Sequence, residues 1–395
     1  MAENSSNTAT VYDPRTVLEQ LIRCQSVTPH DGGSLNTLSD QLDALGFRTQ
    51  IVEFESEDSP AIKNLYARIG DRAPNLCFAG HTDVVPPGEL SSWSHDPFSA
   101  TVEDGVLYGR GAVDMKGGIA AFVAAASSFL SSHPYFDGSI SFLITGDEEG
   151  PAINGTDKLL KWITEQGETI DACVLGEPTN PETIGDAIKV GRRGSLSGEI
   201  IVDGVQGHVA YPHLARNPIP VLLDVMQAVL GQPLDAGNNR FQPSNLEFVT
   251  ADVGNPALNV IPVRATAKFN IRFNDIWTAD TLASEIEERC VAALPDDDDY
   301  SLRINWKGRP SPCFLTRDEK LINTLSSAIE TVCGKLPEIS TGGGTSDARF
   351  IKDYCPVVEF GLVGQTMHQV DERVELSDLQ LLTRVYETFL ERYFA

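Results

Sequence analysis

The chain of 395 residues is longer than one hydrophobic core usually supports, so we expect two domains. Its formal net charge of -26 disfavours nucleic acid and anionic membranes as partners, and no apolar run is long enough to span a bilayer. Residues 1–12 are polar and lack the pattern of a secretory signal, and the 7 dispersed cysteines form no C-x-x-C pair. These features predict a cytoplasmic protein with reduced thiols and argue against a cysteine-bound zinc.

Apolar periodicity and helix-start signals predict alternating strands and helices in the first half of the chain. Helices are expected over 14–24, 34–46, 119–130 and 156–166, and strands over 47–54, 64–69, 75–79, 106–108, 139–145 and 172–175. Asp13 followed by Pro14 is a typical helix start. The helix over 119–130 is apolar nearly all round, which indicates a buried helix.

Acidic residues or histidine follow several of these strands directly. His81 and Asp83 come after the strand at 75–79, Asp147, Glu148 and Glu149 after the strand at 139–145, and Glu177 after the strand at 172–175; Asp114 precedes the helix over 119–130. Each feature alone is common: His-x-Asp is often a plain polar pair, and three adjacent acids often form an exposed turn. Because ligands of open α/β sheets bind at the carboxyl ends of strands, we expect these side chains to share one edge.

From about residue 194 the pattern changes to strand, helix, two strands, helix and strand, over 195–203, 219–230, 246–253, 264–274, 279–293 and 300–307. This order is typical of a ferredoxin-like unit. In the strand at 264–274, residues 265, 267, 269, 271 and 273 are apolar, which predicts one covered face. We therefore predict an inserted domain over 194–307 and a discontinuous catalytic domain over 1–193 and 308–395.

The α/β pattern returns in the last segment. We expect a helix over 318–333, a short helix after Asp347, a strand over 356–360, a loop containing His368 and a final helix capped by Ser377. The fold class is thus α/β, with a mixed-sheet catalytic domain and an inserted α+β domain of the ferredoxin-like type.

The candidate ligands are imidazoles and carboxylates, a donor set that suits zinc, manganese or cobalt. Two imidazoles and three or more carboxylates exceed the three protein ligands of a single catalytic zinc. They fit a centre of two cations that share one carboxylate. The spacing of the residues does not distinguish among these metals.

Four runs resemble the co-catalytic metallohydrolases that include aminoacylases, acetylornithine deacetylase and carboxypeptidase G. They are GHTDVVPPG (80–88), GRGAVDMKGG (109–118), TGDEEGPAINGT (145–156) and LGEPT (175–179), and the resemblance extends over about residues 14–393. It implies hydrolysis of a linear amide by two zinc ions, which cobalt can replace. One ion would be held by His81, Asp114 and Glu177, and the other by Asp114, Glu149 and His368.

The resemblance also implies roles beside the metals. Glu148 would be the general acid and base, and Asp83 would orient His81. The peptide bond from Asp114 to Met115 would be cis. The inserted domain would form a homodimer, from which His208 would reach the partner's site and stabilise an oxyanion. Without that resemblance, His208 is more simply explained as a loop histidine satisfied by the backbone.

Four other runs favour, within this family, an N-succinyl amide of a diamino dicarboxylic acid over an N-acetyl amide or a dipeptide. They are GRRGSLSG (191–198), GVQGHVAYPHLARNP (204–218), GGGTSDARFI (342–351) and LSDLQLL (376–382). An anionic substrate needs well-placed guanidinium groups in so acidic a chain. The candidate substrate-binding residues are Arg192, Ser195, Asn259, Arg272, Gly344 and Thr345. Each arginine could instead form a surface salt bridge, and the glycine-rich run lacks the phosphate-binding pattern of an NTPase.

Overall fold

The computed structural model describes residues 11–57 and 59–395, so most of the polar segment 1–12 lies outside the described residues. The chain divides into two compact units. The larger comprises Met1–Val190, Thr316–Ser340 and Ser346–Ala395, and the smaller comprises Gly191–Leu315 and Thr341–Thr345. The boundaries differ by a few residues from those expected, because two short strands at the ends of the insertion, β9 (Gly191–Arg192) and β16 (Phe314–Leu315), pair with each other.

The larger unit is built on a mixed sheet of eight strands in the order β1-β2-β6-β3-β7-β18-β8-β17. Their bounds are β1 (Arg48–Ser56), β2 (Ser59–Ile69), β3 (Asn75–His81), β6 (Ser139–Thr145), β7 (Ala172–Leu175), β8 (Ala187–Lys189), β17 (Glu338–Ser340) and β18 (Val357–Glu359). A separate sheet of three strands joins β4 (Thr101–Glu103), β5 (Val106–Tyr108) and β19 (Arg373–Glu375).

The central strands β3, β6 and β7 are parallel, so their carboxyl ends meet at one edge of the sheet. All seven residues of β3 and of β6 are buried. Such fully buried runs are typical of strands covered on both faces. The predicted convergence of the strand ends is therefore confirmed.

Helices pack on this sheet. They are α1 (Pro14–Arg23), α2 (Ser34–Ala44), α3 (Lys116–Ser132), α4 (Thr156–Glu165), α7 (Glu319–Cys333), α8 (Ala348–Ile351) and α9 (Leu376–Tyr393). The ring of Phe78 on β3 stacks on Phe122 of α3 at 4.3 Å and meets Tyr386 of α9 at 5.9 Å. The predicted burial of α3 is confirmed, since Gly117–Ala126 is buried throughout.

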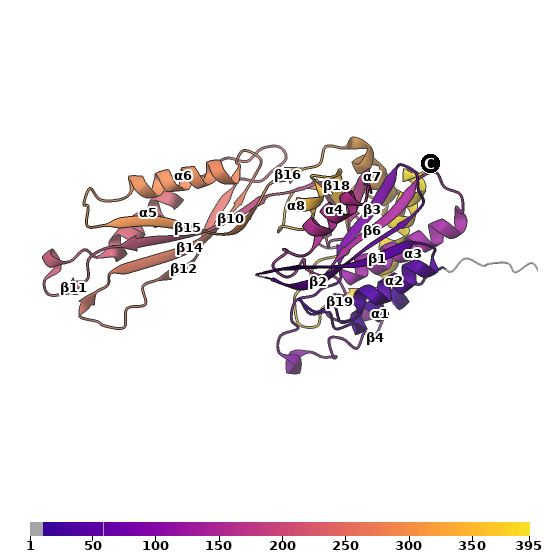
Figure 1. Ribbon diagram of the computed structural model, residues 1–395, viewed down its shortest axis with the longest axis horizontal. Helices are drawn as coiled ribbons and strands as arrows, with labels where there is room; N and C mark the ends of the chain where they lie inside the picture. The colour runs from indigo at the N-terminus through magenta and orange to yellow at the C-terminus, as the bar shows by residue number, and fades with distance from the viewer. Residues whose placement is uncertain (1–10, 58) are drawn as a thin grey trace, which may run out of the picture. The chain divides into compact units, whose positions relative to one another are not determined.

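The smaller unit has the predicted ferredoxin-like order. It runs β10 (Gly194–Asp203), α5 (Pro218–Leu230), β12 (Asn245–Asp252), β14 (Arg264–Phe273), α6 (Ala279–Ala292) and β15 (Ser301–Ser311), with a short pair β11 (Gly207–His208) and β13 (Val260–Ile261). The main sheet is antiparallel in the order β12-β14-β10-β15. Both helices lie on one face of it, where alternate residues of β14 are buried as predicted (Figure 1).

One helix start was predicted wrongly. The final helix begins at Leu376, and its N-cap is Glu375 rather than Ser377, which lies inside the first turn. Pairing of β19 with β5 continues to Glu375 and so fixes where the helix begins. Among the described residues, no helix is both long and apolar enough to cross a membrane. The seven cysteines are all free.

Candidate active site

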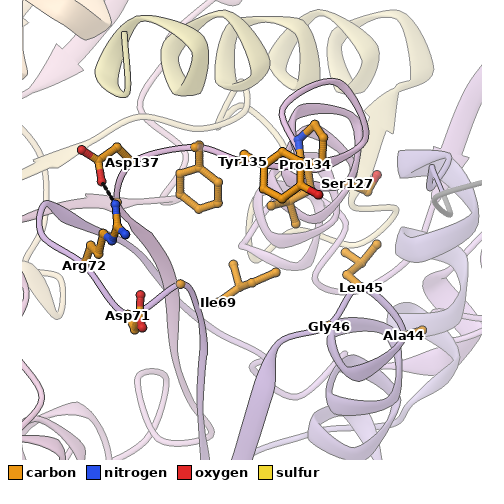
Figure 2. Close-up of a pocket in the computed structure, with 14 residues that line it drawn as sticks. Ala44, Leu45, Gly46, Ile69, Asp71, Arg72, Ser127, Pro134, Tyr135 and Asp137 are labelled. Atoms are coloured by element: carbon orange, nitrogen blue, oxygen red, sulfur yellow. Dashed lines mark hydrogen bonds and ion pairs between the residues drawn. The ribbon is translucent and has the colours of Figure 1, made fainter.

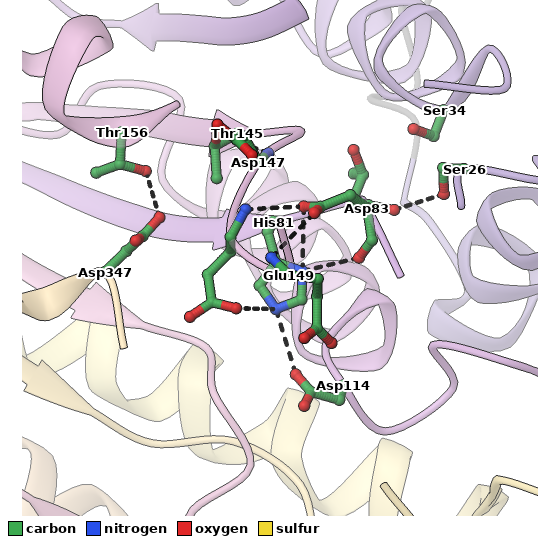
Figure 3. Close-up of polar contacts among 12 residues, drawn as sticks. Ser26, Ser34, His81, Asp83, Asp114, Thr145, Asp147, Glu149, Thr156 and Asp347 are labelled. Carbon is green, nitrogen blue, oxygen red and sulfur yellow. Dashed lines mark hydrogen bonds and ion pairs between the residues drawn. The ribbon is translucent and has the colours of Figure 1, made fainter. Parts of the chain in front are cut away.

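His81 is the last residue of β3 and is buried. Its Nε2 lies 3.2 Å from Oδ1 of Asp114 and 3.8 Å from Oε1 of Glu177 (Figure 3). Its Nδ1 lies 2.9 Å from the backbone carbonyl oxygen of Asp83. A carbonyl can only accept, so Nδ1 carries a proton, and Nε2 of the neutral ring keeps a lone pair for a metal ion.

Asp83 supports the site differently from the prediction. Its carboxylate is 3.6 Å from Nδ1 of His81, and the backbone carbonyl of Asp83 accepts the hydrogen bond instead. The carboxylate accepts hydrogen bonds from the backbone amides of Glu148 at 3.3 Å and Glu149 at 3.0 Å. Asp83 therefore links the end of β3 to the acidic turn after β6.

Asp114 contacts both histidines through different oxygens. Oδ1 faces His81, and Oδ2 lies 3.3 Å from Nε2 of His368, which is also 2.7 Å from Oε1 of Glu149. The peptide bond between Asp114 and Met115 is cis, as expected. The structure thus brings the five predicted ligands together, with Asp114 between the two groups.

The site concentrates more negative charge than its protein partners balance. Burial, followed by repulsion from neighbouring carboxylates, raises the pKa of Glu148 and of Glu177 well above the usual range. Oε1 of Glu177 is buried and has no hydrogen-bond partner among the described residues. Hydrogen bonds to Asp114 and Glu149 raise the pKa of His368 to about 10. Bound protons or cations would balance this excess of negative charge.

The donor atoms lie close enough together to bind cations. The ligand atoms of His81, Asp114 and Glu149 lie within 4.8 Å of one another, and so do those of His81, Glu148 and Glu177. Oε2 of Glu148 is 4.0 Å from Nε2 of His81, beside the position that a bound ion would take. The residues present therefore fit a centre of two cations with N and O ligands.

Comparison with known proteins decides the family. The profile of Peptidase family M20/M25/M40 matches residues 77–392. The chain belongs to this family. The M20 chain is accordingly a metal-dependent hydrolase whose family includes proteins with dinuclear metal sites.

Three solved structures show the same fold as the M20 chain. An M20 family metallo-carboxypeptidase from Sulfolobus solfataricus is 18% identical with a TM-score of 0.76, covering 97% of this chain and 99% of its own. A tripeptidase from Staphylococcus aureus is 19% identical with a TM-score of 0.75, covering 96% and 98%. A dinuclear metal-binding M20 peptidase from Bacillus subtilis is 15% identical with a TM-score of 0.68, covering 97% and 98%.

Two other acids near the centre are held by the protein itself. The carboxylate of Asp147 accepts hydrogen bonds from the backbone amides of Ile153 and Asn154. That of Asp347 accepts from Oγ1 of Thr156 at 2.7 Å (Figure 3). In the acidic run, Asp147 thus fixes the turn, while Glu148 and Glu149 face the ligands.

Sequence reasoning missed Glu372 and Arg110. Glu372 is fully buried and accepts a hydrogen bond from Nη1 of Arg110 at 2.7 Å and others from the backbone beside Asp114. The sequence does place Glu372 four residues after His368 and Arg110 four before Asp114. An ion pair between such distant segments becomes visible only in the folded chain.

All six predicted substrate-binding residues lie in the smaller unit, where four of them form two pairs. Nη1 of Arg192 donates to the carbonyl of Gly344 at 3.2 Å, Ser195 pairs with Arg272 across β10 and β14, and the carbonyl of Asn259 accepts from the residue after His208. The short helix expected after Asp347 is α8, which begins at Ala348, so Gly344 and Thr345 lie in the loop before it.

The larger unit also contains a cavity of about 740 Å³ (Figure 2). It is lined by residues after β2, such as Asp71 and Arg72, and by residues before β6, such as Tyr135 and Asp137. This is the edge of the sheet opposite the carboxyl ends of the parallel strands. The cavity is therefore separate from the metal ligands.

Proposed function

We propose that this protein is a cytoplasmic succinyl-diaminopimelate desuccinylase. It would hydrolyse N-succinyl-LL-2,6-diaminopimelate to succinate and LL-2,6-diaminopimelate, a step of lysine and diaminopimelate biosynthesis, with two zinc ions that cobalt can replace. The support from the sequence is the set of runs over 191–198, 204–218, 342–351 and 376–382. The nearest alternatives are an acetylornithine deacetylase and a dipeptidase of the same family.

The observation that carries the proposal is a pair of guanidinium groups in the smaller unit. Nη1 of Arg272 is buried and has no hydrogen-bond partner within the described chain. Burial, and then the neighbouring charge of Arg193, lower the pKa of Arg272. Arg272 as a whole is half-buried, and a guanidinium N–H that is buried without a partner is costly unless an anion binds it. A free carboxylate of the substrate, such as the end of a succinyl group, would supply that anion, and an acetyl group would not.

The chain's own residues suffice for the proton transfers of amide hydrolysis. When bound, the two cations would polarise the amide carbonyl and make a water molecule more acidic. Glu148 would take the proton from the attacking water and give it to the leaving amine nitrogen. Burial and nearby carboxylates, which raise the pKa of Glu148, favour a group that accepts and then releases a proton.

The hydrogen bond made by His208 leaves its Nε2 free to donate, which supports its proposed role. Its Nδ1 lies 3.0 Å from the backbone amide of Ala210 and therefore accepts that hydrogen bond. The proton of the neutral ring is then on Nε2, which is the donor that oxyanion stabilisation requires. The side chain is exposed. We propose that it acts in the partner's site of a homodimer formed through the smaller unit.

The substrate is tested by comparing kcat/KM for N-succinyl-LL-2,6-diaminopimelate, N-acetylornithine and a dipeptide. The succinyl compound should be preferred. Arg272→Met should lower kcat/KM for it by about 100-fold, since a buried charge-assisted contact is worth roughly 3 kcal/mol, and should change the others far less. The exposed Arg309→Met serves as the matched control. A preference for N-acetylornithine would exclude the proposed substrate.

The class of function is tested with Glu148→Ala. A binding protein that has lost catalysis would show no turnover in the wild type, whereas the hydrolase should lose several orders of magnitude in kcat on this substitution. Metal content measured by atomic emission should stay unchanged, because Glu148 is not among the proposed ligands. Full activity of Glu148→Ala would show that another group transfers the proton.

A further inference from the structure

The loop that carries His368 ends in a buried carboxylate. His368 itself is about half exposed and has a φ of 62°, and it reaches Glu149 and Asp114 from this loop. Four residues later Glu372 is fully buried. One short segment therefore delivers a candidate ligand at one end and a buried anion at the other.

Glu372 is surrounded by hydrogen-bond donors of the segment that leads to Asp114. One oxygen accepts from Nη1 of Arg110 at 2.7 Å and from the amide of Gly111 at 3.0 Å; the other accepts from the amides of Val113 at 2.9 Å and Asp114 at 3.2 Å. Both oxygens are thus engaged, and the charge is paired with Arg110. Glu372 is therefore suited to hold the backbone in place rather than to bind a cation.

Backbone pairing puts Glu372 in this position. Arg373 pairs with Tyr108 in the antiparallel ladder of β19 and β5, and the carbonyl of Glu372 continues the ladder by accepting from the amide of Gly109 at 2.9 Å. The side chain then reaches the turn that follows. A second anchor precedes it, since the carboxylate of Asp371 accepts from the amide and hydroxyl of Ser94.

We propose that Glu372 is a positioning residue of the metal centre. It fixes the backbone of Asp114 relative to His368 and thereby sets the affinity for the ion that these two residues and Glu149 would hold. The proposal rests on the metal centre of the proposed function. The ion that His81, Asp114 and Glu177 would hold depends less on Glu372, because two of these three ligands come from the ends of β3 and β7 and only Asp114 is shared with the other ion.

The test is a metal titration of the metal-free protein with Zn²⁺ alone, by calorimetry and chelator competition, so that no substrate is involved. Glu372→Asp keeps the charge but is one methylene too short to reach all four donors. Glu372→Gln keeps the length but turns one acceptor into a donor. Both variants should bind the ion of His81 and Glu177 as the wild type does. They should bind the ion of Glu149 and His368 about 10- to 100-fold more weakly, the usual effect of losing a supporting contact. Excess Zn²⁺ should restore kcat.

Two control variants separate positioning from general loss of stability. Val374→Ala removes buried apolar volume from the same strand and should lower the melting temperature without changing either affinity. Glu375→Gln alters an exposed carboxylate one residue further on and should change neither. If one of the two Glu372 variants fails to fold, the zinc affinities of the other variant test the proposal. Equal loss of both affinities, or none, would overturn the positioning role, whereas a wild type that binds fewer than two ions would overturn the proposed centre itself.

Discussion

Replacing Glu177 by glutamine should make the metal-free protein more stable, although Glu177 is a candidate ligand. The carboxylate is buried, and burial together with Asp114 and Glu148 raises its pKa well above the usual range. Its Oε1 has no hydrogen-bond partner in the described part of the chain. A neutral side chain of the same shape removes the cost of an unpaired buried charge.

The expected gain follows from that cost. Leaving a buried polar or charged group unpaired costs about 1–3 kcal/mol, so Glu177→Gln should raise the free energy of unfolding of the metal-free protein by roughly that amount at pH 8. This corresponds to a rise of about 2–10 °C in the melting temperature of the larger unit. With saturating zinc the wild type should become more stable than Glu177→Gln, because each ion at about 1,000 times its Kd stabilises the wild type by roughly 4 kcal/mol.

The gain should also depend on pH with a definite sign. A carboxyl whose pKa is raised in the folded state binds more protons folded than unfolded, so the wild type loses stability as the pH rises through the folded pKa. The advantage of Glu177→Gln should therefore be largest at pH 8 and shrink towards pH 5. Differential scanning calorimetry of chelator-treated protein measures it, with exposed Glu165→Gln as control. A variant less stable than the wild type at pH 8 without metal would refute the reasoning.

Three further predictions concern the fold. Asp235→Ala should destabilise the smaller unit by about 2–4 kcal/mol in urea denaturation, because the carboxylate accepts four hydrogen bonds, whereas exposed Asp224→Ala should have no effect. Burial lowers the pKa of Lys116 to about 8, so the free energy of unfolding of the wild type should rise by roughly 3 kcal/mol relative to that of Lys116→Met between pH 8 and 10.5. The same dependence of unfolding free energy on pH in both proteins would contradict this. Phe78→Ala should cost about 3–5 kcal/mol, because it leaves a cavity between β3, α3 and α9; a loss below 1 kcal/mol would contradict the packing.

The fold and the meeting of the polar strand ends were predictable because both depend on local patterns, whereas the assignment of ligands to two ions came from the family resemblance. Apolar runs of the right length mark β3, β6 and β7, and the polar residues directly after them must share an edge once the strands are parallel. The start of α9 was not predictable from Ser377, since the ladder of β19 with β5 overrides the local capping preference. The register of two segments far apart in the sequence has no local signal.

The role of each carboxylate at the site could not be predicted for a related reason. Asp83, Asp147, Glu372 and Glu177 are buried acids at or beside the candidate ligands, and Glu148 is partly buried there. Backbone amides donate to both oxygens of Asp83 and of Glu372 and to Oδ2 of Asp147, and Glu372 is also paired with Arg110. Glu148 and Glu177 face other carboxylates instead, and these add to burial in raising their pKa values. Burial also raises the pKa of Asp83 and of Glu372, but hydrogen bonds from backbone amides oppose that rise.

This difference in partners separates supporting acids from reactive ones. An acid whose oxygens accept hydrogen bonds from backbone amides is stabilised in its ionised form by them, and it holds that backbone in place. An acid that is buried without such partners must bind a proton or a cation, which is the property that a metal ligand or a general base needs. The sequence shows five similar acids near two histidines, and only the hydrogen bonds made on folding divide them into these two groups.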